Sequence, residues 1–411
     1  MNILFLTNLL PYPLDGGGKI NSYTKLKALS LGGHRVDLAC FTEEKTPSPE
    51  AEQAVLRFCR RVEQVYVPIT TADNKGYMMR QALFSLFTPY SLGVYKFYVR
   101  GMERCLKKLA ETERYDCIYF NCCPVYVYGP LTKKLWPEAK TVMDEHNCET
   151  VIMQRWAENS HNPAMKAFLI LETRKLGRFE KKALAEMDHT IVLSEPDLEA
   201  MRSLLGRDFP HTIIPTGVPD YPVKTDHDTA GEMISILFVG TMTWAPNDLG
   251  LIWFLEEVIP LMEAERKPYH LYIVGKNPSE TVRKCAGDCP HITLTGYVES
   301  VQEYYDKCQF MIVPLFVGSG LRVKIIEAFS HGMPVVSTTV GAEGIRYTDG
   351  ESILIADDAQ SFVKQIDRMR DPALRRSLSE NCRKVYDRDH SVEAMARALN
   401  GMLDEVVKDF S

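Results

Sequence analysis

The chain has 411 residues, of which 45% are hydrophobic and 25% are charged. This is ordinary for a globular protein and leaves room for two or three domains. No uncharged apolar run is long enough to cross a membrane and no signal peptide precedes the first strand, so we expect a cytoplasmic protein. The eleven cysteines fit no usual zinc spacing and favour reduced thiols over disulfides. The net charge of −6 divides into +3 over residues 1–218 and −9 over the remainder, which argues against general nucleic-acid binding.

The first half of the chain alternates short apolar runs with helical patterns. The loop that follows the first strand is rich in Pro and Gly and leads into a helix over 19–31, and a second, long helix is predicted over about 163–185. Alternation of this kind is typical of a doubly wound parallel sheet. The predicted strands cover 3–7, 34–40, 62–67, 115–120, 140–143, 189–193 and 212–214.

The same pattern begins again after a linker predicted over 215–231. Helices are predicted over 249–263, 372–386 and 392–408. We therefore predict an α/β fold of two Rossmann-like domains that face each other across a cleft, over 1–218 and 219–388, with a helix at 389–411 that packs back towards the first domain. The predicted strands of the second domain cover 234–239, 269–274, 292–295, 310–314, 334–337 and 352–355.

One stretch of the second domain reads as strand, glycine loop and helix. Gly318, Ser319 and Gly320 interrupt the chain after the strand at 310–314 and allow close backbone approach. The helix then runs from about residue 321 to 331, with Arg322 in its first turn. Free backbone N–H groups and the helix dipole make that end a natural anion site.

Two charged residues of this helix share one face. Lys324 and Glu327 are three positions apart, which places them together on the helix surface. A lysine suits a diphosphate, and a carboxylate can accept hydrogen bonds from the two hydroxyls of a ribose. The pattern therefore indicates a nucleotide site, although a salt-bridged surface helix has the same spacing.

Three motifs give the chain a family resemblance. They are DGGGK at 15–19, IPTGV at 214–218 and GSGLRVKIIEAFSHGMPVVST at 318–338. The chain resembles GT-B glycosyltransferases of family 4. Pro246-Asn247 and Trp253-Phe254 make it similar to the branch that builds bacterial surface polysaccharides. The resemblance implies retaining transfer of a sugar from a nucleotide-diphosphate donor to a glycan or polyprenyl-linked acceptor, without a metal or a further cofactor.

The resemblance also assigns roles to residues. It implies that Glu327 binds the donor ribose and that Arg322 and Lys324 act on the diphosphate and the leaving group. It places Gly16 near the acceptor and His146, after the strand at 140–143, near the donor sugar. The other implied donor-binding residues are Gly17, Gly18, Gly240, Thr241, Val298, Gly318, Ser319, Gly320 and Leu321.

The sequence departs from the family pattern at two places. The family usually has a second glutamate eight positions before Glu327, and this chain has Ser319 there. Many members also have a basic pair after the first strand of the second domain, where this chain has TMTWAPND at 241–248. We therefore expect the neutralisation of the phosphate charge to depend more heavily on Arg322 and Lys324.

Two carboxylates lie beside His146. Asp144 and Glu145 are candidates for acceptor binding or for a base, and they are equally candidates for caps of a helix that starts near residue 147. A lone histidine at a strand end is also often structural. The sequence leaves these alternatives open.

Residues 75–108 mix aromatic and basic side chains. The segment holds seven Lys and Arg residues and one acidic residue, Glu103. This composition fits an anionic membrane surface, where a lipid-linked acceptor would be reached. A buried set of aromatics beneath a solvated basic face gives the same composition.

The mechanism and two rival functions stay open at this stage. Retaining transfer proceeds either through a carboxylate nucleophile or by a same-face reaction in which the donor phosphate takes the acceptor proton. No motif places a nucleophilic carboxylate, which favours the same-face reaction. The rivals are a catalytically silent nucleotide-sugar-binding subunit and a twin-domain sugar-nucleotide 2-epimerase.

Overall fold

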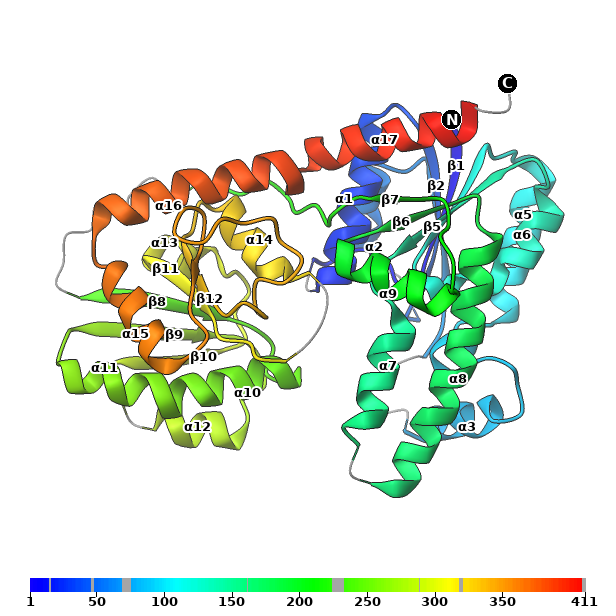
Figure 1. Ribbon diagram of the computed structural model, residues 1–411. Coiled ribbons are helices and arrows are strands. Elements are labelled where there is room, and N and C mark those ends of the chain that lie inside the picture. Colours follow the sequence, from blue (N-terminus) through cyan, green and yellow to red (C-terminus); the bar gives the residue numbers. More distant parts are fainter. Residues whose placement is uncertain are drawn as a thin grey trace. The chain divides into compact units, whose positions relative to one another are not determined.

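The computed structural model describes residues 1–14, 16–45, 48–68, 75–160, 162–223, 233–287, 289–317 and 321–408. The chain forms two compact units, shown in Figure 1. Unit 1 comprises Met1–Gly217 together with Val392–Ser411, and unit 2 comprises Val218–Ser391. The predicted linker at 215–231 lies partly outside the described residues.

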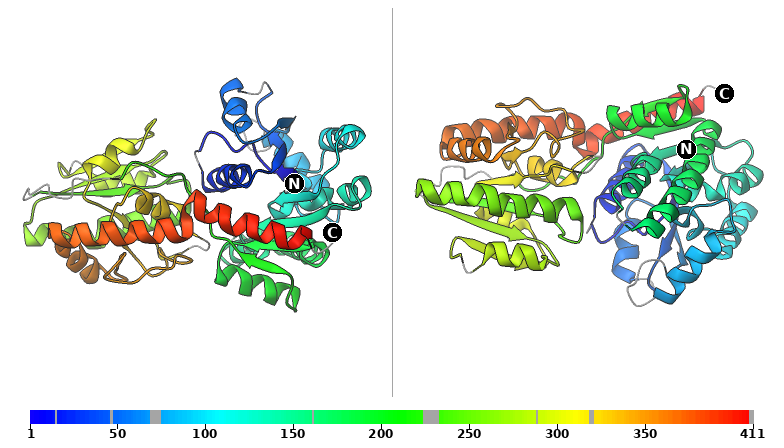
Figure 2. Two further views of the ribbon diagram at one scale, coloured as in Figure 1. Left: turned by 90° about the horizontal axis from the view of Figure 1, so that it is seen from above. Right: turned by 60° about the horizontal axis from the view of Figure 1, so that its bottom comes forward.

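Unit 1 is built on a seven-stranded sheet in the order β3-β2-β1-β4-β5-β6-β7, and all its neighbouring strands pair in parallel. Helices lie on both faces of the sheet (Figure 2). This confirms the doubly wound parallel sheet predicted for the first half. The strands are β1 (Asn2–Thr7), β2 (Arg35–Thr42), β3 (Arg61–Tyr66), β4 (Cys117–Asn121), β5 (Lys140–Glu145), β6 (His189–Val192) and β7 (His211–Ile213).

The central strands of unit 1 are apolar on both sides because helices cover both faces. In β1, Leu4 and Leu6 face one buried cluster, whereas Ile3 and Phe5 face the other. The helices are α1 (Gly17–Leu31), α2 (Pro49–Leu56), α3 (Lys75–Ser85), α4 (Leu92–Tyr95), α5 (Arg100–Thr112), η2 (Cys123–Tyr128), α6 (Gly129–Leu135), α7 (Glu149–Glu158), α8 (Pro163–Glu186) and α9 (Glu195–Leu205).

The C-terminal helix α17 (Val392–Lys408) completes unit 1 by packing on α1. Its buried positions recur at helical spacing, and Met395 and Leu399 lie in the same cluster as Leu26 of α1. The two helices approach closely at Gly32, where an added Cβ would lie 2.4 Å from the side chain of Asn400.

Unit 2 is built on a six-stranded sheet in the order β10-β9-β8-β11-β12-β13, again parallel throughout. The predicted repetition of the fold is therefore confirmed. The strands are β8 (Ile234–Val239), β9 (Tyr269–Val274), β10 (Ile292–Gly296), β11 (Phe310–Val313), β12 (Val335–Ser337) and β13 (Leu354–Ile355).

One predicted helix of unit 2 is divided in the structure. Instead of one helix over 249–263, the chain forms α10 (Ala245–Trp253), a π-helical turn η3 (Phe254–Val258) and α11 (Ile259–Glu265). Pro260 has no N–H to donate and crowds the preceding turn, which the wider turn accommodates. The other helices are α12 (Glu280–Ala286), α13 (Gln302–Lys307), α14 (Val323–Ser330), α15 (Ala359–Arg368), α16 (Pro372–Val385) and η4 (Tyr386–His390).

Two further expectations about the chain can be compared with the structure. All eleven cysteines are free, in agreement with a reduced thiol set. Within the part of the chain that the structure describes, none of the helices is both long and apolar enough to span a bilayer.

Candidate functional site

Lys324 lies in the first turn of α14, at the carboxyl end of β8. Its Nζ donates to the carbonyl oxygen of Val239 at 2.8 Å and to Oδ1 of Asn247 at 2.6 Å. Burial, assisted by the neighbouring charge of Arg322, lowers the pKa of Lys324 to about 7. The sheet edge therefore holds a half-buried amine whose pKa lies close to neutral pH.

Arg322 precedes α14 as its N-cap residue, so the prediction that it lies in the first helical turn is wrong. Its φ of −88° and ψ of 87° are not helical, and the helix begins at Val323. The side chain is 4% exposed, and its Cζ lies 5.4 Å from the centre of the Trp244 ring. Arg322 and Lys324 are thus close enough for their charges to interact, as the pKa of Lys324 indicates.

Glu327 lies one turn further along α14. Burial raises the pKa of its carboxyl to about 7, and the charge of Lys324 opposes this rise. The charges of Lys324 and Glu327 therefore interact, in agreement with their predicted position on one face of the helix. The structure brings Arg322, Lys324 and Glu327 together as one group on a short helix and its N-cap residue.

The loops beside this group also carry predicted residues. Gly240 and Thr241 follow β8 directly, and Thr241 accepts a hydrogen bond from Nδ2 of Asn247 at 3.0 Å. Gly275 follows β9 with a φ of +156°, and an added Cβ there would lie 1.9 Å from the carbonyl oxygen of Gly240. Because only glycine fits this contact, the β8 and β9 loops are packed together at the sheet edge.

The remaining donor-side predictions divide into two groups. Val298 is half-buried in the loop after β10, and Leu321 is half-buried just before α14. Gly318, Ser319 and Gly320 lie outside the described residues. Their predicted roles, including that of Ser319 in place of a glutamate, therefore stay predictions.

In unit 1, His146 follows β5 and belongs to a chain of hydrogen bonds. Its Nε2 lies 3.3 Å from Oδ1 of Asn121, and Nδ2 of Asn121 donates to Oγ of Ser22 at 2.6 Å. Ser22 in turn donates to the carbonyl oxygen of Gly18 at 2.8 Å. The structure thus connects the predicted histidine to the predicted glycine loop. Burial lowers the pKa of His146, which favours the neutral ring.

The glycine loop itself is open. Gly16, Gly17 and Gly18 are exposed, and an added Cβ at Gly16 or Gly18 would meet no atom within 4 Å. No neighbouring residue in the described part of the chain therefore requires glycine at these two positions. Asp15, the first residue of the motif, lies outside the described residues.

Asp144 is fully buried beneath His146 and has two partners. Its Oδ2 lies 2.5 Å from Nζ of Lys25 and 2.8 Å from the hydroxyl of Tyr119. Nε2 of His146 is 3.9 Å from the same oxygen. The carboxylate does not reach the surface in this structure, so its predicted contact with an acceptor is not supported by its position.

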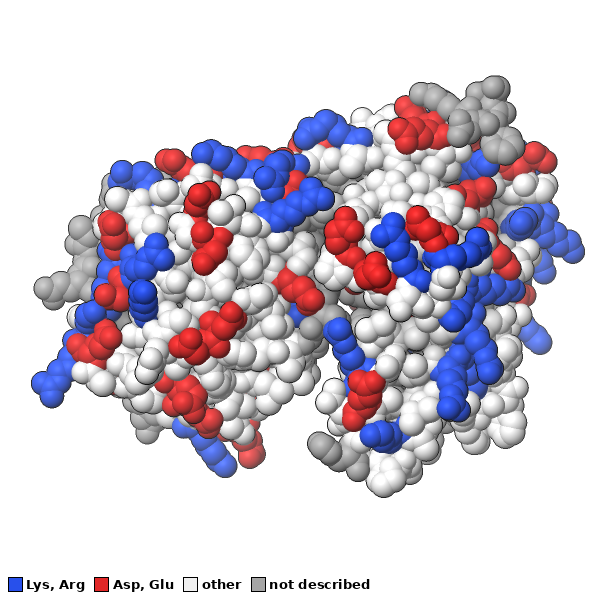
Figure 3. All heavy atoms as spheres, viewed as in Figure 1, with Lys and Arg blue, Asp and Glu red and all other residues white. Residues whose placement is uncertain are grey.

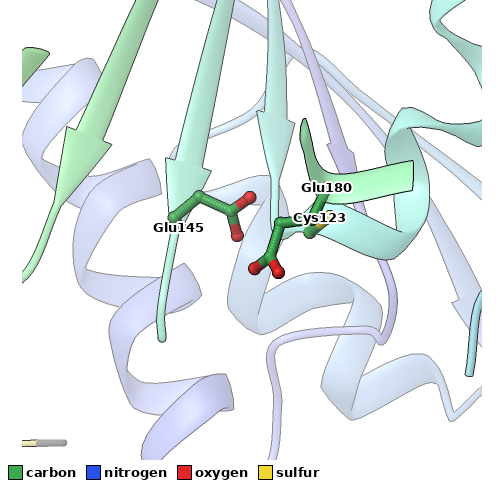
Figure 4. A group of neighbouring side chains, drawn as sticks. All are labelled: Cys123, Glu145 and Glu180. Carbon is green, nitrogen blue, oxygen red and sulfur yellow. The ribbon is translucent and has the colours of Figure 1, made fainter. Parts of the chain in front are cut away.

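Glu145, the last residue of β5, lies beside Cys123 and Glu180, as Figure 4 shows. The three buried ligand atoms lie within 4.8 Å of one another. Burial raises the pKa of Glu145 well above its usual value, and the neighbouring carboxylate of Glu180 raises it further. The raised pKa favours the protonated form of the Glu145 carboxyl, and its burial does not support acceptor binding by Glu145.

Neither Asp144 nor Glu145 caps the helix that follows. The cap of α7 comes from Glu180 of α8, whose carboxylate accepts the backbone N–H groups of Glu149 at 2.8 Å and Thr150 at 3.0 Å. These are free N–H groups of the first helical turn, which a carboxylate satisfies well. The local capping alternative is therefore replaced by a cap from thirty residues away.

The segment 75–108 divides between core and surface. Phe97 is 3% exposed, whereas Phe84 and Phe87 are 52% and 83% exposed. Nζ of Lys175 in α8 donates to the carbonyl oxygen of Ser85 at 2.7 Å and holds this segment beside α8. We give the name apolar tip to exposed apolar side chains from this segment, α7 and α8; it consists of Met79, Leu83, Phe84, Leu86, Phe87, Trp156, Met165, Ile170 and Leu171.

Basic side chains accompany the apolar tip. Arg80, Arg155 and Lys166 are exposed among its members. In the view of Figure 3, Lys and Arg side chains gather over α8, above a lower end of unit 1 that is mostly uncharged. Of these three basic residues, Arg80 belongs to the predicted segment 75–108, and its contact with a membrane stays a prediction.

The comparison with protein families concerns unit 2. Residues 234–371 match the family model described as "Glycosyl transferases group 1". This range contains the Arg322, Lys324 and Glu327 group and the loop after β8. Unit 2 carries a glycosyl transferases group 1 domain.

Other proteins resemble the chain over most or all of its length. An "Uncharacterized 44.6 kDa protein in cps region" of Klebsiella pneumoniae is 27% identical over 373 residues, which is 89% of each chain. Sucrose-phosphate synthase from Thermosynechococcus elongatus superposes with a TM-score of 0.69 at 18% identity, covering all of both chains. Anabaena Alr3699/HepE in complex with UDP and glucose gives 0.68 at 14% identity, covering 98% of this chain and all of that one. The lipopolysaccharide outer core galactosyltransferase WaaB gives 0.61 at 13% identity, with the same coverage. These likenesses confirm the predicted GT-B fold.

The structure also identifies site residues that the sequence did not single out. In the group 1 domain this is Trp244, which contacts Arg322. Asn247, which the sequence marked only as part of the Pro246-Asn247 motif, contacts Lys324. In unit 1 they are Lys25 and Asn121, which contact Asp144 and His146. A lysine among the buried positions of α1 was the one available signal, because a buried charge needs a partner.

Proposed function

We propose that the protein is a retaining, metal-independent glycosyltransferase that uses a nucleotide-diphosphate sugar as donor. The observation that carries the proposal is the group formed by the buried Arg322 and the half-buried Lys324 and Glu327 within the group 1 domain. Two cations next to one carboxylate suit a diphosphate joined to a ribose. Solved relatives of this fold hold UDP and UDP-glucose, which supports the same class of donor here.

In this proposal each residue of the group has a separate task. Lys324 and Arg322 neutralise the diphosphate, and Glu327 in its ionised form accepts hydrogen bonds from the ribose hydroxyls. A bound diphosphate raises the pKa of Lys324, because a nearby negative charge favours the ammonium form. Glu327 is the residue that distinguishes a nucleotide from a simple phosphate.

The proposed reaction takes place on one face of the donor sugar. The bond between the anomeric carbon and the diphosphate oxygen breaks, and the nucleoside diphosphate leaves with the electron pair. The acceptor oxygen bonds to the anomeric carbon from the same side, and its proton passes to the departing phosphate. Arg322 and Lys324 stabilise the charge that develops on the leaving group, and no protein nucleophile is required.

We place the acceptor side in unit 1 and the protein in bacterial surface-polysaccharide synthesis. The relative from a cps region supports this setting. His146, joined through Asn121 and Ser22 to Gly18, is the proposed contact for the transferred sugar. The acceptor is a glycan or a polyprenyl-linked glycan in this proposal, and the protein acts in the cytoplasm at the inner face of the cell membrane.

The test of this function is product analysis with a panel of nucleotide-diphosphate sugars. The unchanged chain is expected to release nucleoside diphosphate slowly by donor hydrolysis, and Glu327→Ala is expected to lose this activity. Chelation of divalent ions with EDTA is expected to leave the activity unchanged. An epimerised sugar nucleotide as the product, or donor binding without turnover in the presence of bacterial lipid-linked glycans, would replace the proposal with one of its rivals.

The apolar tip is proposed to contact the anionic bilayer that carries a lipid-linked acceptor. Exposed aromatic and aliphatic side chains beside Arg80, Arg155 and Lys166 suit the interface of such a bilayer. The test is sedimentation with phosphatidylglycerol vesicles. Phe84→Ser with Phe87→Ser is expected to reduce the bound fraction, whereas Leu249→Ser, at a comparably exposed residue of unit 2, leaves it unchanged.

A further inference from the structure

Asn247 lies in the first turn of α10 and belongs to the segment 241–248, which contains no basic residue. Its side chain is buried, with 4% of its surface exposed. It does not supply charge, but it touches the residue that does. Its Oδ1 accepts a hydrogen bond from Nζ of Lys324 at 2.6 Å.

The orientation of this amide is determined by its two partners. Oδ1 faces an ammonium, which only donates, and Nδ2 faces the carbonyl oxygen of Thr241 at 3.0 Å, which only accepts. A rotated amide would place NH₂ against the ammonium and oxygen against oxygen. Aspartate or leucine has nearly the same shape, yet neither satisfies both contacts.

Nζ of Lys324 is therefore held at a defined point by an acceptor that does not neutralise its charge. Its Nζ has a second acceptor in the carbonyl oxygen of Val239 at 2.8 Å. Both acceptors are neutral. Among the residues that the structure describes, the Lys324 amine has no hydrogen-bond acceptor besides these two. An ammonium has three N–H groups, so two acceptors leave one for an added ligand.

We infer that Asn247 is a positioning residue for the donor: it fixes Nζ of Lys324 at the end of β8 so that the third N–H points a positive charge at the donor diphosphate. This inference rests on the proposed function. It explains how the TMTWAPND segment contributes to phosphate binding without a basic side chain. Asn247 acts through Lys324 and does not itself touch the diphosphate.

The inference makes a prediction about pH that a purely structural role does not. A hydrogen-bond acceptor favours the charged form of an amine, and Lys324 already has a pKa lowered to about 7 by burial. Removing the acceptor in Asn247→Ala should move the alkaline loss of diphosphate affinity to lower pH. Placing a carboxylate there in Asn247→Asp should move it to higher pH, because an opposite charge favours the ammonium.

The experiment is calorimetric titration of the full chain with UDP, GDP, ADP, CDP and dTDP. For the diphosphate that binds, we expect Asn247→Ala to weaken affinity about tenfold at about pH 8 and less than about threefold at about pH 6, as for a lost hydrogen bond to a charged group. In a Lys324→Ala background the second substitution should produce no further loss. Asn381→Ala, on α16 of the same unit, is the matched control and should bind as the unchanged chain does.

Each result decides between the inference and the function on which it rests. If none of the five diphosphates binds the unchanged chain, the proposed function is contradicted and the inference falls with it. If one diphosphate binds, two results overturn the inference alone. The first is that Asn247→Ala weakens the affinity by the same factor at both pH values. The second is that Asn247→Ala weakens the affinity equally in the Lys324→Ala background. If Asn247→Ala does not fold, the direction of the pH shift in Asn247→Asp decides: a shift to higher pH supports the inference, and no shift overturns it.

Discussion

Nζ of Lys25 lies 2.5 Å from Oδ2 of Asp144, and neither side chain is exposed. The pair joins α1 to β5, two elements separated by more than a hundred residues. Burial lowers the pKa of Lys25, and the neighbouring Asp144 opposes this effect. The pair therefore fixes the helix that begins within the glycine run 16–18 against the strand that ends just before His146.

Removing one member of this pair should lower the free energy of unfolding. Lys25→Met leaves a buried carboxylate without its cation and is expected to lower the free energy of unfolding by about 3–5 kcal/mol. The double variant Lys25→Met, Asp144→Leu should recover part of that loss because no unpaired charge remains. Urea denaturation followed by circular dichroism measures both. Lys27→Met, a half-buried neighbour on α1, is the control, and an equal midpoint for Lys25→Met and the unchanged chain would contradict the prediction.

The Glu145 and Glu180 carboxyls predict how stability depends on pH. Burial raises the pKa of Glu145 in the folded chain, so between its unfolded value and that raised value the folded state binds more protons than the unfolded state. Stability is therefore greatest below about pH 4.5 with respect to this group and falls as pH rises, by up to about 1.4 kcal/mol per pH unit.

Glu145→Gln tests this dependence. The amide cannot ionise, so the variant should lose much of the decline in melting temperature between about pH 5 and 8 and should melt above the unchanged chain at the upper end. Glu138→Gln changes the same charge at an exposed position and should keep the original slope. An equal decline in Glu145→Gln and in the unchanged chain would show that Glu145 is ionised when folded.

The contact between α17 and α1 gives a prediction about unit 1. Leu399 is fully buried in the shared cluster, and Leu399→Ala is expected to cost about 2–5 kcal/mol of stability because it leaves a cavity. Arg397→Ala, on the exposed face of the same helix, should change stability by less than about 0.5 kcal/mol. Thermal unfolding of the two variants compares them directly, and equal melting temperatures would contradict the packing.

The sequence predicted the two sheets well because their strands are apolar on both faces and the intervening helices have regular spacing. The predicted strand at 234–239 and the long helix from residue 163 agree with β8 and α8 within a residue. It could not predict the turn at Phe254–Val258, since the response of a helix to Pro260 depends on packing. Nor could the sequence show that α14 begins only after Arg322.

The partners of buried polar groups were beyond sequence reasoning for a different reason. Asp144 and Glu145 were considered with their neighbours along the chain, as cap or base. Their actual neighbours are Lys25, Tyr119 and Glu180, which come from other elements. Sequence distance says nothing about such contacts, so the residue types were recognised but their surroundings were not.

The Lys324 and Glu327 pair predicts a bell-shaped pH dependence of nucleoside diphosphate binding. The pKa of each group is near 7, and the proposed binding form is an ammonium beside a carboxylate. Affinity should therefore fall above about pH 7 as Lys324 loses its proton and below it as Glu327 gains one, by up to about tenfold per pH unit. Titrations from about pH 5.5 to 9 are expected to show that Glu327→Gln removes the acid limb and Lys324→Met the alkaline limb. Affinity that does not vary with pH would exclude these protonation states from binding.

The proposed donor site is tested most directly by titrating inorganic pyrophosphate and the cognate nucleoside diphosphate into the full chain and two variants. Lys324→Ala should weaken both ligands by about tenfold or more, because both carry the diphosphate that this residue contacts. Glu327→Ala should weaken the nucleoside diphosphate and leave pyrophosphate binding unchanged or slightly stronger, since pyrophosphate has no ribose. Lys284→Ala on α12 serves as the control. Unchanged affinity of the nucleoside diphosphate in both Lys324→Ala and Glu327→Ala would contradict the assignment of α14 as the donor site.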